Sequence, residues 1–370
     1  MSGLRLGYSF HGFLADVKLD GHGNEISTPD GNATYSWSIL WEAQRRGHTV
    51  YLMQEDRDWQ SFLKFGKSLF SAFSQEKRKL AYQRCLRTSW SFGSEWNDYP
   101  ELDVLLLEWR FPILGRNTSE MRGLPGYQSD LDRQHELLEH YSGTKTKVVI
   151  WDLDHKLELV DEANWLPDAI FETSVEPRDL CVKRTRVEPP FVIDDLLQHP
   201  TRPADPKKML VYIGSRYERD NVIDEWIKPI SDEIPGAVRF VGKWDADARR
   251  RWPNISFGER VGVAGFAREY GDAVAVPLLA KRSYMEVGFV TPRPWEAVLF
   301  GSLPIGFVGH RGIENYSSAV ARNADDLFDL VQIYSSNGET IRKIDREEMA
   351  HRLQFMDVKN FVDKIEGVMG

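Results

Sequence analysis

The sequence is poor in cysteine and has no long apolar run. Cys85 and Cys181 are the only cysteines, and neither has a second Cys or a His at zinc-ligand spacing nearby. A disulfide framework and a structural zinc site are therefore unsupported, and we expect two buried thiols. The longest apolar stretches, such as Val104–Leu107 and Val148–Trp151, fall far short of the roughly 20 residues of a membrane span. Because polar residues follow the N-terminus too closely for a signal peptide, we expect a cytoplasmic protein with no membrane partner.

The chain also lacks an overall excess of positive charge. Its 47 Lys and Arg against 56 Asp and Glu give a formal net charge of -9, which argues against a protein that coats nucleic acid over its whole surface. With 42% hydrophobic and 28% charged residues the chain can bury a sizeable core, which excludes a disordered protein. Its 370 residues are enough for one large or two medium globular units.

The first half alternates strand-like and helix-like segments. Leu4–Tyr8 is a short apolar strand, and the helix that follows ends at Gly47, where a left-handed turn leads into a strand through Met53. Near-continuous apolar runs are typical of parallel strands that helices cover on both faces. Such runs are Val104–Trp109, Lys147–Trp151 and Ala169–Phe171, the last of which we expect to be the final strand of this half.

The second half repeats this alternation after a proline-rich linker, Val187–Lys208. Its expected strands are Met209–Ile213, Val238–Val241, Ala273–Pro277 and Leu303–Val308. We therefore predict an α/β protein with two Rossmann-like, doubly wound domains, 1–200 and 201–345, and an amphipathic closing helix over 346–370. Doubly wound domains bind ligands at the carboxyl ends of their strands, so the two domains are expected to face one another across a cleft.

The most informative segment is Tyr284–Gly306, YMEVGFVTPRPWEAVLFGSLPIG. Thr291 is the expected helix N-cap, Pro292 the first helical residue and Gly301 the end of the helix before the next strand. The pattern R-x-x-E-A-x-x-x-G-x-L-P in this context resembles the donor-binding segment of GT-B glycosyltransferases. The resemblance implies the GT-B fold and, as donor, a nucleotide-diphosphate sugar, with a UDP-sugar favoured and no metal required.

The same resemblance implies roles for individual residues. Glu296 would accept hydrogen bonds from the ribose hydroxyls, and the helix N-terminus with nearby cations would face the diphosphate. Many retaining members carry another Glu seven or eight residues earlier, where this chain has Phe289 and Gly288, so the stereochemical outcome stays open. The alternative is an ordinary surface ion pair between Arg293 and Glu296.

Cations also follow the strands of the second half. In GT-B enzymes the loop after the first donor-domain strand offers a Gly backbone and an Arg to the β-phosphate, which implies Arg216 first and Arg219 second. Solvated surface cations are the alternative reading. The donor-side residues that we predict are Gly214, Arg216, Arg219, Lys281, Arg282, Arg293 and Glu296.

Two segments of the first half carry candidate acid–base groups. His11 follows the first strand between glycines and is a candidate general base, although such a His is often structural. Asp154 and His155 end the run Asp152-Leu153-Asp154-His155 after an apolar strand. A strand followed by D-x-D also resembles the metal motif of GT-A transferases and the nucleophile pair of haloacid-dehalogenase-type phosphatases, and a carboxylate that caps a loop is a further alternative.

Residues 64–87 hold seven Lys or Arg against one Glu, with aromatic rings among them. Cations beside rings that can stack on a displaced base are typical of nucleic-acid contact, and a solvated helix with core rings is the alternative. Glu108–Ile113, Gly115–Asn117 and Trp151–Leu157 are similar to stretches of phage-encoded glycosyltransferases that decorate hydroxymethylated pyrimidines in viral DNA. This similarity implies a bacteriophage protein of the host cytoplasm, and double-stranded DNA with a hydroxymethylated base such as hydroxymethylcytosine as partner. The acceptor-side residues that we predict are Lys77, Arg78, Lys79, Arg110, Arg116 and Asn117.

Two other functions stay open at this point. One is a GT-B transferase that acts on a small molecule or glycan, which an acidic chain suits. The other is a non-catalytic nucleotide- or DNA-binding module on a degenerate GT-B scaffold, which the absence of the second Glu suggests.

We predict that changing Lys77, Arg78 and Lys79 together to Ala weakens duplex DNA binding. If these side chains neutralise phosphates, the salt dependence of the affinity should flatten by up to about 0.9 log unit for each phosphate that is no longer neutralised. DNA affinity measured across a salt series for both proteins tests this, and identical slopes would contradict it.

Overall fold

A computed structural model describes residues 3–10, 31–55, 85–90, 99–176, 181–192, 206–336 and 338–370. His11 and the predicted cations Lys77, Arg78 and Lys79 lie outside these residues. The chain divides into two compact units, each built on its own sheet. The first takes in strand β1, the described residues from Asn32 to Pro190 and, from the far end of the chain, Val358–Gly370; the second takes in Phe191–Asp357.

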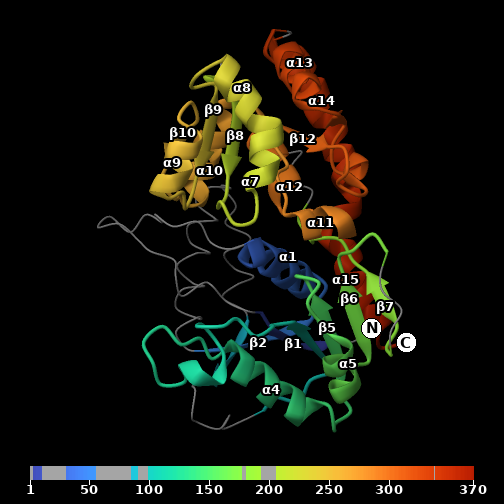
Figure 1. Ribbon diagram of the computed structural model, residues 1–370. Helices are drawn as coiled ribbons and strands as arrows, with labels where there is room; N and C mark the ends of the chain where they lie inside the picture. Colours follow the sequence, from blue (N-terminus) through green and yellow to red (C-terminus); the bar gives the residue numbers. More distant parts are fainter. Residues whose placement is uncertain are drawn as a thin grey trace. The chain divides into compact units, whose positions relative to one another are not determined.

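The first unit contains a parallel sheet in the order β3-β2-β1-β4-β5-β6-β7. Figure 1 labels β1, β2, β5, β6 and β7 of this sheet. Its strands are β1 Arg5–Ser9, β2 Thr49–Glu55, β3 Leu86–Trp90, β4 Val104–Glu108, β5 Lys147–Asp152, β6 Ala169–Glu172 and β7 Arg184–Arg186. Its helices are α1 Gly31–Arg45, the 3-10 turn η2 Ser119–Met121, α4 Asp130–Tyr141, α5 Leu159–Trp165 and α15 Val358–Gly367. All residues of β4 are buried, as its unbroken apolar run predicts.

The turn from α1 into β2 confirms the expected helix end. Gly47 adopts φ 84, and its neighbour His48 donates its backbone N–H to the Ala43 carbonyl at 3.0 Å. Residues with a Cβ avoid this left-handed conformation, so glycine is required where the chain reverses.

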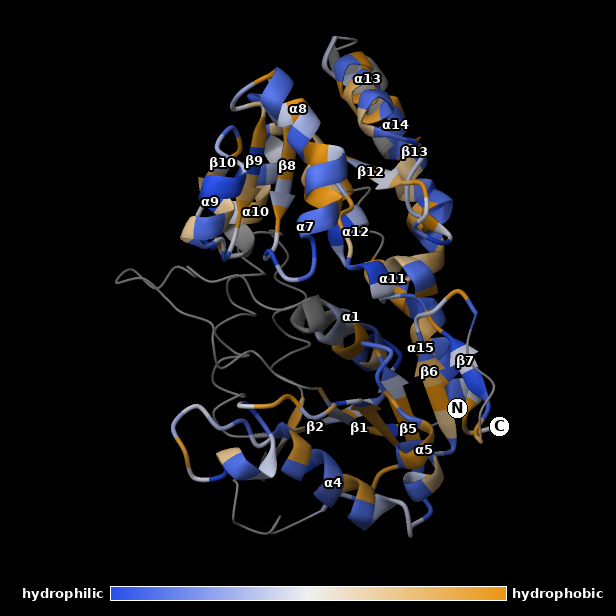
Figure 2. Cartoon of the chain, viewed as in Figure 1, coloured by the Kyte–Doolittle hydropathy of each residue, from blue (hydrophilic) through white to orange (hydrophobic). Residues whose placement is uncertain are grey.

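The second unit contains a parallel sheet in the order β10-β9-β8-β11-β12-β13, in which β8 and β11 are neighbours. Its strands are β8 Lys208–Ile213, β9 Val238–Val241, β10 Ser256–Gly258, β11 Ala273–Pro277, β12 Leu303–Phe307 and β13 Ala319–Ala321. Its helices are α7 Asp220–Val222, the π-helical turn η3 Ile223–Ile227, α8 Lys228–Glu233, α9 Ala246–Arg251, α10 Val263–Gly271, α11 Arg282–Val287, α12 Arg293–Leu299, the 3-10 turn η4 Ile313–Asn315, α13 Ala324–Ser336, α14 Gly338–Arg352 and the 3-10 turn η5 Leu353–Met356. Figure 2 shows the hydrophobic β5 and β6 of the first unit and the hydrophilic α9 of the second. Both sheets confirm the predicted α/β class.

Four short strands differ from the sequence-based expectation. β7 follows β6 in the first sheet, so Ala169–Phe171 is not its last strand. β3, β10 and β13 were not expected either. Each of the four is an edge strand of only three to five residues, which is too short for its alternation to stand out from a loop.

The expectation of two buried thiols is half right. Cys85 is buried, and burial raises the pKa of its thiol to about 12, whereas Cys181 is exposed. None of the helices in the described ranges is long and apolar enough to cross a membrane.

The last helix completes the first unit. Phe361 of α15 is buried against Trp151 of β5 and Phe171 of β6, with ring centroids 4.8 and 5.5 Å away. Arg46, just after α1, forms ion pairs with Asp363 and Glu366 of α15. The predicted closing segment therefore forms the end of α14, the turn η5 and α15 rather than one continuous helix.

We predict that Phe361→Ala lowers the free energy of unfolding of the first unit by about 3–5 kcal/mol, because it opens a cavity against two aromatic rings. Met369→Ala is the control: its side chain is exposed, so the change should stay within about 0.5 kcal/mol. Urea unfolding followed by tryptophan fluorescence measures both, and equal stability of the two variants would contradict the packing role of α15.

Candidate functional site

The candidate site of the second unit lies where β8 and β11 end. These strands are neighbours in the sheet but not in the sequence, so the connections after them run to opposite sides, and in doubly wound sheets ligands bind at the carboxyl ends of such strands. The segments that follow the two strands, Gly214–Arg219 and Leu278–Arg282, carry five of the seven predicted donor-side residues. Arg293 and Glu296 come from α12.

Arg293 is fixed against the end of β8. Its Nε donates to the Ile213 carbonyl at 3.1 Å, its Nη1 to Thr291 Oγ1 at 2.6 Å, and its guanidinium lies 4.6 Å from the centroid of the Tyr212 ring. A Cβ on Gly214 would come within 2.7 Å of Arg293 Nη2 and 2.6 Å of the Tyr212 hydroxyl. A side chain at this position would therefore force the Arg293 guanidinium or the Tyr212 ring to shift.

Glu296 lies on the first turns of α12. The helix begins at Arg293, with Pro292 as its cap, so it starts one residue later than the sequence predicts. Desolvation raises the pKa of Glu296 to about 7, although the nearby Arg293 cation and Tyr270 act in the opposite direction. Tyr270 is buried, and burial together with the charge of Glu296 raises its pKa well above the usual value.

Arg219 is a buried cation held by neutral partners. Its Nη1 donates to the carbonyls of Tyr217 at 2.7 Å and Ser215 at 3.3 Å, and no ion pair joins it to a carboxylate in the part of the chain that the structure describes. Desolvation lowers its pKa. A buried cation whose charge is not compensated by a carboxylate is suited to binding an anion. Nearby, the Lys281 ammonium lies 4.2 Å from the centroid of the Tyr284 ring.

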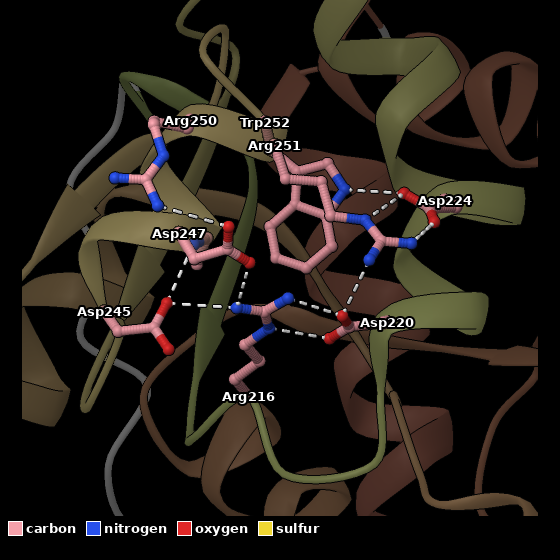
Figure 3. Close-up of polar contacts among 9 residues, drawn as sticks. Arg216, Asp220, Asp224, Asp245, Asp247, Arg250, Arg251 and Trp252 are labelled. Carbon is pink, nitrogen blue, oxygen red and sulfur yellow. Dashed lines mark hydrogen bonds and ion pairs between the residues drawn. The ribbon is translucent and has the colours of Figure 1, made fainter.

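Arg216 and Arg282 have carboxylate partners. Arg216 contacts Asp220 at 2.6 Å, Asp247 at 2.8 Å and Asp245 at 3.0 Å, and these carboxylates raise its pKa (Figure 3). The network extends through Asp224, Arg250, Arg251 and Trp252. Arg282 pairs with Glu286 one helical turn away, and both side chains are exposed. The structure thus brings Gly214, Arg293 and Glu296 together near the end of β8, with the Arg219 charge close enough to act on Arg293. Lys281 lies over the Tyr284 ring, whereas Arg216 and Arg282 are held by carboxylates.

In the first unit, polar groups end the strands β1 and β4. The Tyr8 hydroxyl donates to Glu108 and lies 3.0 Å from Ser36 Oγ, and all three residues are buried. Burial, reinforced by the Glu108 charge, raises the pKa of Tyr8 well above its usual value. Sequence reasoning did not single out Tyr8 or Glu108, although a Glu that ends the run Val104–Leu107 is a detectable signal.

Two of the predicted acceptor-side residues brace the loop after β4. The Asn117 side chain accepts from the Ile113 N–H at 2.7 Å and donates to the Phe111 carbonyl and to Asp130. Arg110 is buried and pairs with Asp130 at 2.6 Å. Arg116, partly exposed, lies within the loop that they hold.

Asp154 and His155 lie in the turn after β5. Both side chains are partly exposed. His155 adopts φ 58, and its Nδ1 lies 2.8 Å from Oε1 of the buried Glu172. Among the described residues there is no group of three or more His, Cys, Asp or Glu arranged to hold a metal ion.

Comparison with known proteins finds relatives only at the level of structure. No family model and no curated protein match the sequence. An alpha-glucosyltransferase in complex with UDP-glucose and DNA containing an abasic site matches with TM-score 0.60 and 13% identity, and the match covers 100% of both chains. An alpha-glucosyltransferase in complex with UDP and a 13-mer DNA containing an HMU base matches with TM-score 0.57, 12% identity and the same coverage. A glycosyltransferase from Rickettsia africae ESF-5 matches with TM-score 0.56 and 10% identity over 100% of this chain and 98% of that chain. At these identities the likeness establishes the fold, which is GT-B as the sequence predicts.

The raised pKa of Glu296 predicts a specific dependence of stability on pH. Between its ordinary value of 4.5 and about 7 the folded protein binds more protons here than the unfolded chain, so the contribution of Glu296 to stability falls as pH rises. Relative to Glu296→Gln, the free energy of unfolding of the wild type should decline over this window by up to about 1.4 kcal/mol per pH unit. Chemical denaturation of both proteins from pH 4 to 8 measures this, and a constant difference would contradict it.

Proposed function

We propose that this protein is a glycosyltransferase that moves a sugar from a nucleotide-diphosphate sugar to the hydroxyl of a hydroxymethylated base in double-stranded DNA, with a UDP-sugar as the favoured donor. The observation that carries the proposal is the cluster of Gly214, Arg219, Arg293 and Glu296 at the carboxyl ends of β8 and β11 in a GT-B fold.

The chemistry of this cluster suits a nucleoside diphosphate. Glu296 would bind the ribose hydroxyls through its carboxyl oxygens. Arg219 and Arg293 would neutralise the diphosphate, whose charge increases as the bond to the sugar breaks. We assign this task to Arg219 rather than to Arg216, because three carboxylates already compensate the charge of Arg216. Lys281 would add a further positive charge.

The proposed acceptor rests on three observations. Solved structures with the same fold are of alpha-glucosyltransferases in complex with DNA. Residues 64–87 are strongly basic in an acidic protein. The loop after β4 is braced by Arg110 and Asn117 and presents Arg116, whose charge suits a phosphate. Asp154, His155 and His11 are the candidate acid–base groups for the acceptor hydroxyl.

A transferase that acts on a small molecule or glycan is the second candidate. The net charge of -9 favours it, because a highly acidic chain repels a polyanion outside its basic patches. A preference for duplex DNA with a hydroxymethylated base over free hydroxymethylated nucleosides separates the two proposals.

We predict that the wild type transfers labelled glucose from UDP-glucose to a duplex with a hydroxymethylated base and not to the matching plain duplex. At pH 8, where the Glu296 carboxyl is mostly ionised, Glu296→Ala should weaken UDP binding by about 1.5–3 kcal/mol, because it removes charge-assisted hydrogen bonds to the ribose. Calorimetric titration with UDP measures the affinity, and mass spectrometry of the DNA measures transfer.

Glu286→Ala is the matched control. Glu286 lies on the neighbouring helix α11, is exposed and pairs only with Arg282 in the described part of the chain, so its loss should leave UDP affinity unchanged. Equal affinities for the wild type and Glu296→Ala would reject the ribose assignment. If the wild type transfers sugar to none of the nucleic-acid or small-molecule acceptors, the proposal that the protein is a glycosyltransferase is wrong.

A further inference from the structure

A buried charge network lies beside the turn that carries His155. Arg184 of β7 pairs with Glu162 of α5 at 2.8 Å and with Glu172 of β6 at 2.7 Å, and none of the three side chains is exposed to solvent. Asp152, at the end of β5, lies 3.7 Å from the same guanidinium. One cation therefore faces three carboxylates inside the first unit, which leaves the network formally negative.

The second oxygen of Glu172 faces away from Arg184. Oε1 accepts a hydrogen bond from Ser174 Oγ at 2.6 Å and lies 2.8 Å from His155 Nδ1. Burial alone would raise the pKa of Glu172, but His155, Ser174 and Arg184 together lower it to about 2. Glu172 is therefore a carboxylate, and Nδ1 is the imidazole nitrogen that lies beside it.

The backbone holds His155 in an uncommon conformation. Its φ of 58 is one that residues with a Cβ rarely adopt, and such strain persists where the surroundings impose it. Here the side chain of Asp152 fixes the turn, because it accepts the N–H groups of Lys156 at 2.7 Å and Leu157 at 3.0 Å. Nδ1 is buried and forms no well-aligned hydrogen bond in this structure, although Glu172 Oε1 lies only 2.8 Å away, and 20% of the His155 side chain is exposed.

We propose that Glu172 is a positioning residue that holds His155 with its proton on Nδ1 and presents Nε2 as the base for the acceptor hydroxyl. This inference rests on the proposed function. In the step, Nε2 takes the hydroxyl proton, the acceptor oxygen forms a bond to the anomeric carbon, and the bond between that carbon and the phosphate oxygen breaks. Its electron pair leaves with the nucleoside diphosphate, and Glu172 faces the imidazolium that forms.

Arg184 and Ser174 hold Glu172 ionised, so Glu172 does not itself take up the proton. Glu162 is a natural control for Glu172, because it pairs with the same Arg184 at nearly the same distance and is equally buried. It differs in that its other oxygen accepts the Val182 N–H rather than facing His155.

The first test reads the position of the proton without activity. Nitrogen-15 NMR of the imidazoles, with the His155 signal assigned by its loss in His155→Ala, should show the neutral ring protonated on Nδ1 in the wild type and in Glu162→Gln. A neutral ring protonated on Nε2 would overturn the proposal, because Nδ1 would then face the carboxylate without a hydrogen.

The second test reads the rate. Glu172→Gln should lower kcat for sugar transfer by about 10²-fold or more with an unchanged KM for the donor, whereas Glu162→Gln should change kcat less than about threefold. His155→Ala should lower kcat as much as Glu172→Gln does. The double variant should lower kcat no further than either single variant, because His155 and Glu172 act through one proton transfer. Thermal unfolding of Glu172→Gln and Glu162→Gln measures the loss of stability that both variants suffer because Arg184 loses one carboxylate partner.

The outcomes separate the two proposals. An active wild type with equal kcat for Glu172→Gln and Glu162→Gln would overturn the role of Glu172 and leave the transferase standing. A wild type that transfers no sugar to any acceptor would overturn the proposed function itself.

Discussion

A parallel sheet ends all of its strands at one edge, and both candidate sites depend on that constraint. In the second unit the end of β8 brings Gly214 against Arg293 of α12, next to the segment that follows β11. In the first unit the ends of β5 and β6 bring the turn of His155 against Glu172. Because the backbone groups along such strands are satisfied within the sheet, the loops beyond the edge are free to present functional side chains.

The elements that the sequence predicts are those with an unambiguous local signal. β4 and β11 are unbroken apolar runs that are buried throughout, and β8 and β9 are mainly apolar, so hydrophobic burial is a clear local signal for all four. β7 and β10, with sequences RTR and SFG, form because each can hydrogen-bond to the backbone of a neighbouring strand. That information lies in the tertiary structure and not in the segment itself.

The residues of the candidate sites likewise divide into those that the sequence predicts and those that only the fold reveals. The motif around α12 predicts Arg293 and Glu296, since its residues are close in sequence. The carboxylates that hold Arg216 cannot be predicted so simply, because Asp245 and Asp247 lie about 30 residues downstream, at the start of helix α9. Arg216 and Arg219 are three residues apart, yet one has three carboxylate partners and the other carbonyls alone. Only the fold distinguishes a structural cation from one suited to a ligand.

The described second unit leaves and rejoins the first at adjacent points. Phe191 and Asp357, its first and last residues in this stretch, form a bridge in parallel orientation, and the Phe191 N–H donates to the Met356 carbonyl. A segment whose two ends meet behaves as a domain inserted into another, and such domains tolerate transplantation and circular permutation. Phe191–Asp357 thus has its entry and its exit side by side, whereas the first unit needs both the early part of the sequence and α15 to be whole.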